Sequence, residues 1–470
     1  MTIGAETLPP ASLRLALDQH VRHRGDTLTG GSPKRVMRLT PAGWRMLRAL
    51  EQGTESSAVG RALRRRLLDA GIAHPRPQPR ERVSDVTIVV PVRDRAIDLE
   101  ACLAALEPGV NLIVVDDGSR DHGSLATVAT RHDARLVRRP TPGGPAAARN
   151  AGLREVTTEL VAFLDSDCAP ARGWLQALAG HFDDPVVGAV APRVRPMTER
   201  GRSIVQRYLA ARSPLDMGRR EASVEPGGVV SYVPAAALLV RCSALGEGFD
   251  EGLRYGEDVD LVWRLREAGW RVRYDPSVAV AHKEPDALHR ALVRRFRYGT
   301  SAAPLAARHP GRLPPAVLPL WPTLVAALTF SRNHRTAAVL ACQQSAVLAY
   351  RLARLRLPPA WGVRWFAEAT YQAVLSVVRC VTWFALPAAL AYAHRTRRPV
   401  ALAFLVLPAL DEWRRRDKSL DPLRWIPLAL ADDAAYGMGV WWGCIRTGTV
   451  RPLLPRLAAP RAFTWSTRRR

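Results

Sequence analysis

The sequence has few cysteines, and they form no metal-binding or disulfide pattern. Only 6 of the 470 residues are cysteine, no two form a Cys-x-x-Cys pair, and no histidine lies at zinc-finger spacing. We therefore expect neither a structural zinc nor a disulfide framework, and a reducing compartment fits best. The first twenty residues lack an apolar core of signal-peptide length. Export is therefore not expected, and the predicted location is the cytoplasm.

Aromatic and acidic residues are also scarce. Aromatic side chains make up 7% of the chain, and no RNA-binding signature is recognisable, so no nucleic-acid partner is predicted. The 43 acidic residues are outnumbered by 68 lysines and arginines, which gives a net charge of +25. This charge favours a polyanionic partner, but by itself it does not choose among a nucleotide diphosphate, an anionic lipid and nucleic acid.

Long uninterrupted hydrophobic runs are missing as well. The longest stretch without a charge, residues 313–331, contains four prolines, and the other apolar runs of this region are shorter. A spanning helix needs about 20 apolar residues. Arginine clusters at 395–398 and 414–416 flank these runs, which suits helices lying on an anionic cytoplasmic leaflet. We expect association with the inner face of the cell membrane; a buried helical domain or an oligomer interface is the alternative.

The chain is long enough for two or three domains, and its amino-acid composition and hydrophobic pattern change twice along the sequence. Residues 1–80 predict a small winged-helix-like unit, in which Thr40 caps a helix that starts at Pro41 and stops at Gly53. A linker rich in proline and arginine follows it. Residues 81–300 predict an α/β domain, and residues 301–470 a helical, apolar and basic region.

Within the α/β domain, acidic clusters follow the predicted strands. The β-branched run VTIVVP from Val86 is typical of a strand buried on both faces of a parallel sheet. A helix and a second strand, 111–115, lead to Asp116 and Asp117, and a third strand, 160–164, runs into Asp165. Ligands bind at the carboxyl ends of such strands, so these carboxylates are candidate site residues. Taken singly, each cluster could be a helix-capping turn or a solvated acidic patch.

The motifs VTIVVPVRDR, VVDDGS, GGPAAARN, FLDSDC and YGEDVD, in this order, resemble those of family 2 glycosyltransferases with the GT-A, Rossmann-like fold. The resemblance implies that Asp117 reads the nucleobase of a nucleotide-sugar donor while Asp116 supports the turn. It further implies donor binding by residues of the first strand and of the glycine loop: Pro91, Arg93, Asp94, Gly144 and Arg149.

The last two motifs carry the reaction in that family. By resemblance, Asp165 and Asp167 hold a Mg²⁺ or Mn²⁺ ion together with His282, and Asp165 also contacts the donor. Asp258 is the general base of an inverting transfer, and Glu257 is its substrate-binding neighbour. Two alternatives remain open: an acid at a helix N-terminus is favoured by the helix dipole, and a histidine at a strand end is often structural.

Residues 1–80 also look like a small peptide-recognition domain, and the order of the three parts resembles the glycosyltransferases of mycofactocin biosynthesis. Their implied reaction adds glucose from UDP-glucose to a peptide-derived redox cofactor precursor. A membrane-linked glycosyltransferase of polysaccharide or glycolipid synthesis is the alternative. Residues 232–241, YVPAAALLVR, depart from the polar acceptor segment of many relatives, so the acceptor contacts stay open.

Overall fold

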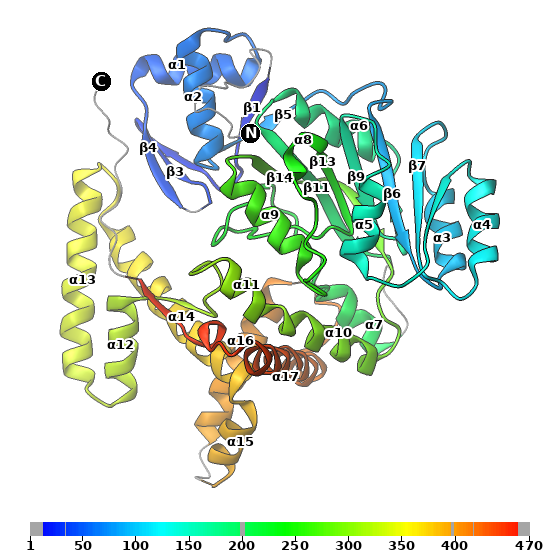
Figure 1. Cartoon of the computed structure of the whole chain (residues 1–470). Helices are drawn as coiled ribbons and strands as arrows, with labels where there is room; N and C mark the ends of the chain where they lie inside the picture. The colour runs from blue at the N-terminus through cyan, green and yellow to red at the C-terminus, as the bar shows by residue number, and fades with distance from the viewer. Residues whose placement is uncertain (1–12, 33, 198–202, 396–398, 417, 459–470) are drawn as a thin grey trace. The chain divides into compact units, whose positions relative to one another are not determined.

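The computed structural model describes residues 13–32, 34–197, 203–395, 399–416 and 418–458 (Figure 1). The packing divides the chain into two compact units, Met1–Pro285 and Asp286–Arg470, named unit 1 and unit 2 below. Strands and helices alternate in unit 1, whereas unit 2 is almost entirely helical. The predicted α/β class is confirmed, and the finer division into three parts stays a prediction.

Unit 1 begins with a small lobe, residues 13–76, which we call the N-terminal lobe. Its first helix starts and stops as predicted, because the Thr40 side chain accepts a hydrogen bond from the Gly43 N–H and Gly53 takes a left-handed φ of 78°. Leucine and isoleucine side chains form its core. Its elements are β1 (Arg14–Leu17), β2 (Arg22–Arg24), β3 (Thr27–Gly30), β4 (Arg35–Arg38), α1 (Pro41–Gln52), α2 (Ala58–Asp69) and β5 (Ala73–Arg76).

The strands of this lobe form two small sheets. Strand β1 pairs antiparallel with β5, so the first and last strands of the lobe lie side by side. The other three strands form an antiparallel sheet in the order β2-β3-β4. The last strand, β5, is therefore held inside the lobe before the chain continues to the large central sheet.

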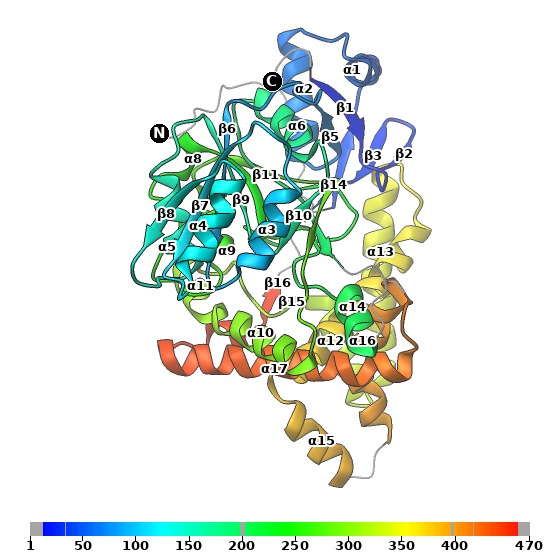
Figure 2. The same cartoon turned by 90° about the vertical axis from the view of Figure 1, so that its right-hand side faces the viewer.

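A large mixed sheet forms the centre of unit 1. Its strand order is β10-β14-β11-β13-β9-β6-β7-β8, and β12 adds to β14 (Figures 1 and 2). The strands are β6 (Val86–Val92), β7 (Asn111–Asp117), β8 (Arg135–Arg139), β9 (Leu160–Leu164), β10 (Cys168–Pro170), β11 (Val187–Pro196), β12 (Ala222–Ser223), β13 (Ala237–Arg241) and β14 (Arg271–His282).

The parallel part of this sheet brings the acidic motifs to one edge. Strand β6 pairs in parallel with β7 and β9, and β7 pairs in parallel with β8. The carboxyl ends of these four strands therefore meet, as expected for an open α/β sheet. Strand β6 is central and buried, which confirms the reading of its β-branched run.

Helices of unit 1 connect these strands and carry several site residues. Helix α5 packs on β6 and β7, and α9 packs against β14. The helices are α3 (Ala96–Ala104), α4 (His122–Arg131), α5 (Pro145–Leu153), α6 (Trp174–Ala179), α7 (Ile204–Ala211), α8 (Cys242–Leu245) and α9 (Glu257–Glu267), with a 3₁₀ turn at Gly180–Asp183.

Unit 2 is a set of helices closed by the short parallel pair β15 (Val317–Pro319) and β16 (Arg456–Ala458). The long helix α17 packs along α10 (Figure 2). The helices are α10 (Leu288–Thr300), α11 (Ala302–Arg308), α12 (Leu320–Phe330), α13 (His334–Arg354), α14 (Ala360–Phe384), α15 (Leu386–Arg395), α16 (Pro399–Arg415) and α17 (Pro422–Thr447), followed by a 3₁₀ turn at Arg451–Leu453.

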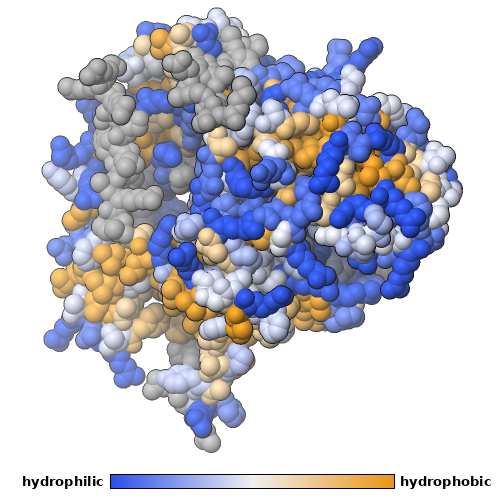
Figure 3. All heavy atoms as spheres, in the orientation of Figure 1, coloured by the Kyte–Doolittle hydropathy of each residue, from blue (hydrophilic) through white to orange (hydrophobic). Residues whose placement is uncertain are grey.

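Apolar side chains are unusually exposed in unit 2. Hydrophobic side chains gather over α12 and α13 in the lower left of Figure 3. On α17, Met438, Trp442 and Ile445 share one face, and between 50% and 72% of each residue is exposed. Among the described helices, no single one has the length and apolar composition to cross a bilayer; the bent pair α14 and α15, broken by 100°, meets those criteria together.

Candidate active site

The turn after β7 is built around Asp116. Its carboxylate is fully buried, accepts the Ser119 N–H at 2.8 Å and lies 2.8 Å from His122 Nδ1. Burial alone would raise its pKa, but the hydrogen bonds from Ser119 and His122 outweigh burial and hold the pKa below its usual range. Asp116 therefore stays charged and fixes the turn that presents Asp117.

Asp117 faces the glycine loop that opens α5. One carboxylate oxygen accepts the Gly143 N–H at 2.9 Å and an Arg139 guanidinium N–H, and the other accepts the Gly144 N–H at 2.8 Å. Gly144 has a φ of 87°, which glycine adopts without strain. Asp117 and Arg139 are paired residues of β7 and β8. The structure thus joins two predicted donor-binding residues, Asp117 and Gly144.

The loop after β6 is joined to the same turn. Asp94 has a left-handed φ of 54°, its N–H donates to Ser119 Oγ at 2.9 Å, and its carboxylate accepts the Arg120 N–H at 2.8 Å. Arg93 is exposed and lies 3.6 Å from the Asp94 carboxylate. Pro91 is half-buried within β6. These three predicted residues lie at or just after the carboxyl end of β6, and their contacts with a donor stay predictions.

Arg149 links two of the acidic clusters. Its guanidinium is 4% exposed and donates to Asp165 at 2.7 Å and to Glu257 at 2.8 Å. It also lies over the Phe249 ring, 5.4 Å from the centroid. Burial opposes the charge, but the two carboxylates outweigh burial and raise the pKa of Arg149. Both terminal nitrogens are engaged, so the side chain orients carboxylates in this structure, and the predicted phosphate contact stays a prediction.

Glu257 and Asp258 occupy the first turn of α9. Asp258 accepts the Val259 N–H at 2.8 Å and the Ala235 N–H at 3.3 Å, which fixes both of its oxygens. Loss of hydration raises the pKa of Asp258. Burial and the neighbouring Asp258 raise the pKa of Glu257 to about 7, against the lowering effect of Arg149. A half-buried carboxylate with a raised pKa is a stronger base than a solvated one and suits proton removal.

Asp167 and His282 converge from two strands. Cys168, which follows Asp167, pairs with His282 in the register of β10 and β14, and this brings Asp167 Oδ1 to 3.4 Å from His282 Nε2. Carboxylate oxygen and imidazole nitrogen are suitable ligands for a divalent cation. The pair therefore fits the predicted metal, whereas Asp165, the third predicted ligand, points to Arg149. Within the described ranges, no three His, Cys, Asp or Glu side chains form a complete metal cluster.

Arg95 is a site residue that the sequence reading missed. Its guanidinium forms an ion pair with the second oxygen of Asp167, and 53% of its side chain is exposed. Arg139, which contacts Asp117, was also missed, because its strand RLVRR is short and rich in arginine and does not stand out as a strand. Knowing that β7 pairs with β8 would have placed Arg139 next to Asp117. The periodicity of a single sequence does not show which strands pair.

Comparisons with known proteins agree with this geometry. The family model for glycosyl transferase family 2 matches residues 87–249. The pre-mycofactocin glycosyltransferase of Mycobacterium tuberculosis (strain ATCC 25618 / H37Rv) is 41% identical over 479 aligned positions, which cover 95% of this chain and 98% of that protein.

More distant similarities cover smaller shares or have lower scores. An N-acetylglucosaminyltransferase of Rhizobium meliloti (strain 1021) is 28% identical over 221 positions, 43% of this chain and 52% of its own length. Among solved structures, the mannosyltransferase PcManGT from Pyrobaculum calidifontis, in complex with GDP-Man and Mn²⁺, has a TM-score of 0.43 and 21% identity. The match covers 78% of this chain and 89% of that one.

Proposed function

The chain belongs to glycosyltransferase family 2, and from this premise we propose that it transfers glucose from UDP-glucose, with inversion, to a peptide-derived redox cofactor precursor. The predicted GT-A fold and glycosyltransferase activity are confirmed by the family match and by the 41% identical relative. The sugar, the stereochemistry and the acceptor belong to the proposal. The extent of that identity, 95% of this chain, supports the same acceptor class, because it reaches well beyond the family 2 segment.

The observation that carries the reaction is the ion-pair network that joins two of the three acidic motifs. Arg149 ties Asp165 to Glu257 and so links the turn that follows β9 to the start of α9. Preorganised charges of this kind lower the barrier because no reorganisation is needed when the bond breaks. In the proposed reaction, the donor lies across this network, between the Asp117 turn and the base Asp258.

In the proposed mechanism, Asp258 accepts the proton of the acceptor hydroxyl. The freed oxygen attacks the anomeric carbon from the side opposite UDP, the bond from that carbon to the UDP oxygen breaks, and the configuration inverts. Asp167 and His282 would hold Mg²⁺ or Mn²⁺, which neutralises the phosphates of the leaving UDP. Asp117, with Arg139 beside it, offers an acceptor and a donor to the edge of uracil.

We further propose that unit 2 holds the enzyme at an anionic membrane surface on the cytoplasmic side. The exposed face of Met438, Trp442 and Ile445 provides aromatic and aliphatic contact, and arginines are abundant nearby. Helices of this kind lie in the interface, and binding grows with buried apolar area and with anionic lipid. This proposal concerns location and leaves the acceptor unchanged.

The test is incubation of the full chain with UDP-glucose, Mn²⁺ and the cofactor precursor, followed by mass spectrometry. We expect one or more hexoses on the precursor and none with the Asp258→Asn variant. Anomeric analysis of the product by NMR tests inversion. Hexose transfer to a lipid-linked glycan, with none to the precursor, would replace this proposal by the polysaccharide or glycolipid alternative.

A further inference from the structure

The N-terminal lobe is joined to the transferase part of unit 1 by buried ion pairs. Asp18 accepts from Arg220 at 3.2 Å and lies 3.0 Å from His74, and the side chains of Asp18 and His74 are only 3% and 4% exposed. Glu221 accepts from Arg76 of the lobe at 2.8 Å. Charges shielded from water hold their geometry, because breaking one pair leaves the other charge buried and unpaired.

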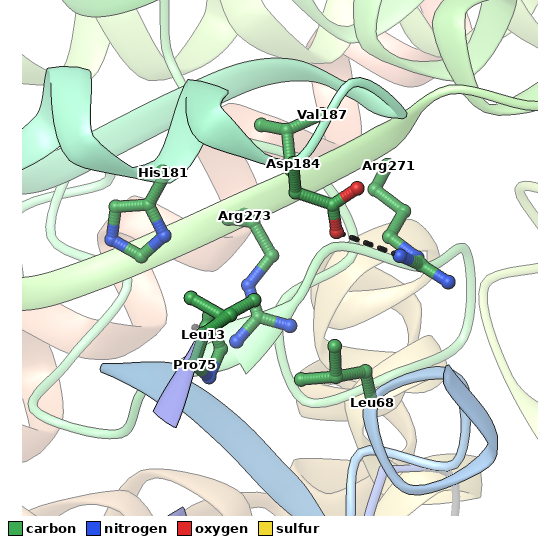
Figure 4. A pocket seen from close by; sticks show the side chains of 8 residues that line it. All are labelled: Leu13, Leu68, Pro75, His181, Asp184, Val187, Arg271 and Arg273. Atoms are coloured by element: carbon green, nitrogen blue, oxygen red, sulfur yellow. Dashed lines mark hydrogen bonds and ion pairs between the residues drawn. The ribbon is translucent and has the colours of Figure 1, made fainter. Parts of the chain in front are cut away.

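A second set of contacts lies around a small cavity between the lobe and the sheet. Figure 4 shows Arg271 beside Asp184, to which it donates at 2.9 Å, and Arg271 also donates to Asp69 of the lobe at 2.9 Å. Arg273 lies 3.1 Å from His74. The cavity has a volume of about 10 Å³, enough for one water molecule at most. The lobe therefore packs closely on this part of the sheet.

The chain continues from the contacts of Arg220 and Glu221 with the lobe through residues 221–236, which we call the bridging segment. In its middle, the Val229 N–H donates to Ser32 Oγ of the lobe at 2.7 Å. A Cβ atom on Gly228 would lie 3.2 Å from the same oxygen, closer than ordinary contact. The bridging segment is thus fitted to the turn of the lobe that contains Ser32.

The far end of the bridging segment contacts the helix that carries the general base. The Ser231 carbonyl accepts from Trp263 Nε1 at 2.9 Å, and Trp263 is 1% exposed on α9. Four residues later, the Ala235 N–H donates to Asp258 at 3.3 Å. One continuous segment therefore contacts the N-terminal lobe at Val229 and the proposed base at Ala235.

We propose that the N-terminal lobe positions Asp258 through the bridging segment, so that Ser32 is a positioning residue for the transfer reaction. The inference rests on the proposed function in one respect, the assignment of Asp258 as the base. An acceptor that contacts the lobe would then also affect the base, because the lobe and Asp258 are hydrogen-bonded to the same segment.

The variant Ser32→Ala tests this coupling, because it removes one hydroxyl and no charge. We expect kcat for glucose transfer to fall about three- to tenfold, as for loss of one hydrogen bond, while the Kd for UDP is unchanged. Hydrogen exchange of residues 229–236 is expected to rise. Ser32→Thr keeps the hydroxyl and restores both, whereas Ser56→Ala, an exposed serine of the same lobe, changes neither.

The two readouts separate failure of the coupling from failure of the proposed reaction. Unchanged exchange in 229–236 together with unchanged kcat in Ser32→Ala would overturn the coupling. Faster exchange in Ser32→Ala, with no glucose transfer by the unaltered protein, would confirm that the lobe holds the bridging segment and would reject the proposed reaction. If Ser32→Ala does not fold, Arg76→Gln removes another contact of the lobe with the bridging segment, the one to Glu221, and the same two readouts decide.

Discussion

The two units differ in their charge balance and in their exposed apolar surface. In unit 1, charged side chains such as Asp18, Arg149 and Arg273 are buried in paired networks, and 40 basic residues are nearly balanced by 35 acidic ones. In unit 2, 28 basic residues face only 8 acidic ones, so most of the net charge of +25 lies there. Large exposed hydrophobic side chains are also concentrated in unit 2.

This difference separates two kinds of function. Paired buried charges fix geometry but contribute little net stability, so their presence indicates a site that needs fixed positions. The membrane attachment that we propose for unit 2 uses excess positive charge beside exposed aromatic groups, which suits an anionic surface with an apolar interior. Catalysis is therefore expected to depend on unit 1 networks, and location on the unit 2 surface.

The variant Asp258→Asn is the strongest test of the claim that catalysis depends on unit 1. Asp258→Asn keeps the shape of the side chain but removes its basicity, and we expect transfer to fall by about 10²- to 10⁴-fold. UDP binding, measured by calorimetry, is expected to change little. Glu267→Gln, exposed in the last turn of the same helix, is the matched control and keeps full activity. Residual transfer near the level of the unaltered protein would place the base elsewhere.

Arg149→Met tests whether the buried network of unit 1 is structural as well as catalytic. Removing this cation leaves Glu257 and Asp165 without their partner, and we expect a loss of about 3 kcal/mol in the free energy of unfolding, measured with urea. The ascending limb of the pH–rate profile is expected to move to higher pH, because Arg149 lowers the pKa of Asp258.

The stability loss in Arg149→Met has a defined pH dependence. The folded pKa of Glu257 is raised, so its contribution to stability is present below its ordinary pKa and is lost as pH rises through about 7. Without Arg149 the folded pKa rises further, so the variant is penalised more at about pH 8 than at about pH 5. An equal loss at both values would show that Glu257 is not the group that responds.

The sequence predicted the elements that carry the motifs better than the contacts among them. The strands before Asp117 and Asp165 and the cap at Thr40 follow from local periodicity and capping, and the structure confirms them. The pairing of Arg149 with two carboxylates does not follow, because it depends on α5, β9 and α9 meeting in three dimensions. The sequence showed only that residues 232–241 lack the polar side chains of the acceptor segment in many relatives. Ala235 hydrogen-bonds to Asp258 through its backbone N–H, which any residue except proline provides.

Trp442→Ser combined with Ile445→Ser tests the proposed membrane role of the unit 2 surface. Both side chains are exposed, so we expect unchanged stability and unchanged transfer in solution. The affinity for vesicles rich in anionic lipid, measured by co-sedimentation, is expected to fall at least about thirtyfold, because the two lost apolar groups together remove roughly 2 to 4 kcal/mol of interfacial burial. Val59→Ser, an exposed apolar residue of unit 1, is the control. Unchanged sedimentation of the double variant would remove the membrane role from this face.

The smallest expected effect concerns Arg95, an exposed charge in an otherwise buried network. It holds one oxygen of Asp167, and the other oxygen lies toward His282, so a divalent cation must compete with this arginine for the carboxylate. Exposed ion pairs are weak, and Arg95→Gln should therefore tighten Mn²⁺ binding only about two- to fivefold, measured by electron paramagnetic resonance without donor. The effect should shrink at high salt, because exposed charges are screened. Arg172→Gln, an exposed arginine without this contact, is expected to change nothing. Weaker Mn²⁺ binding in Arg95→Gln would mean that the arginine assists the metal site instead of competing with it. An exposed charge would then contribute to donor binding in unit 1.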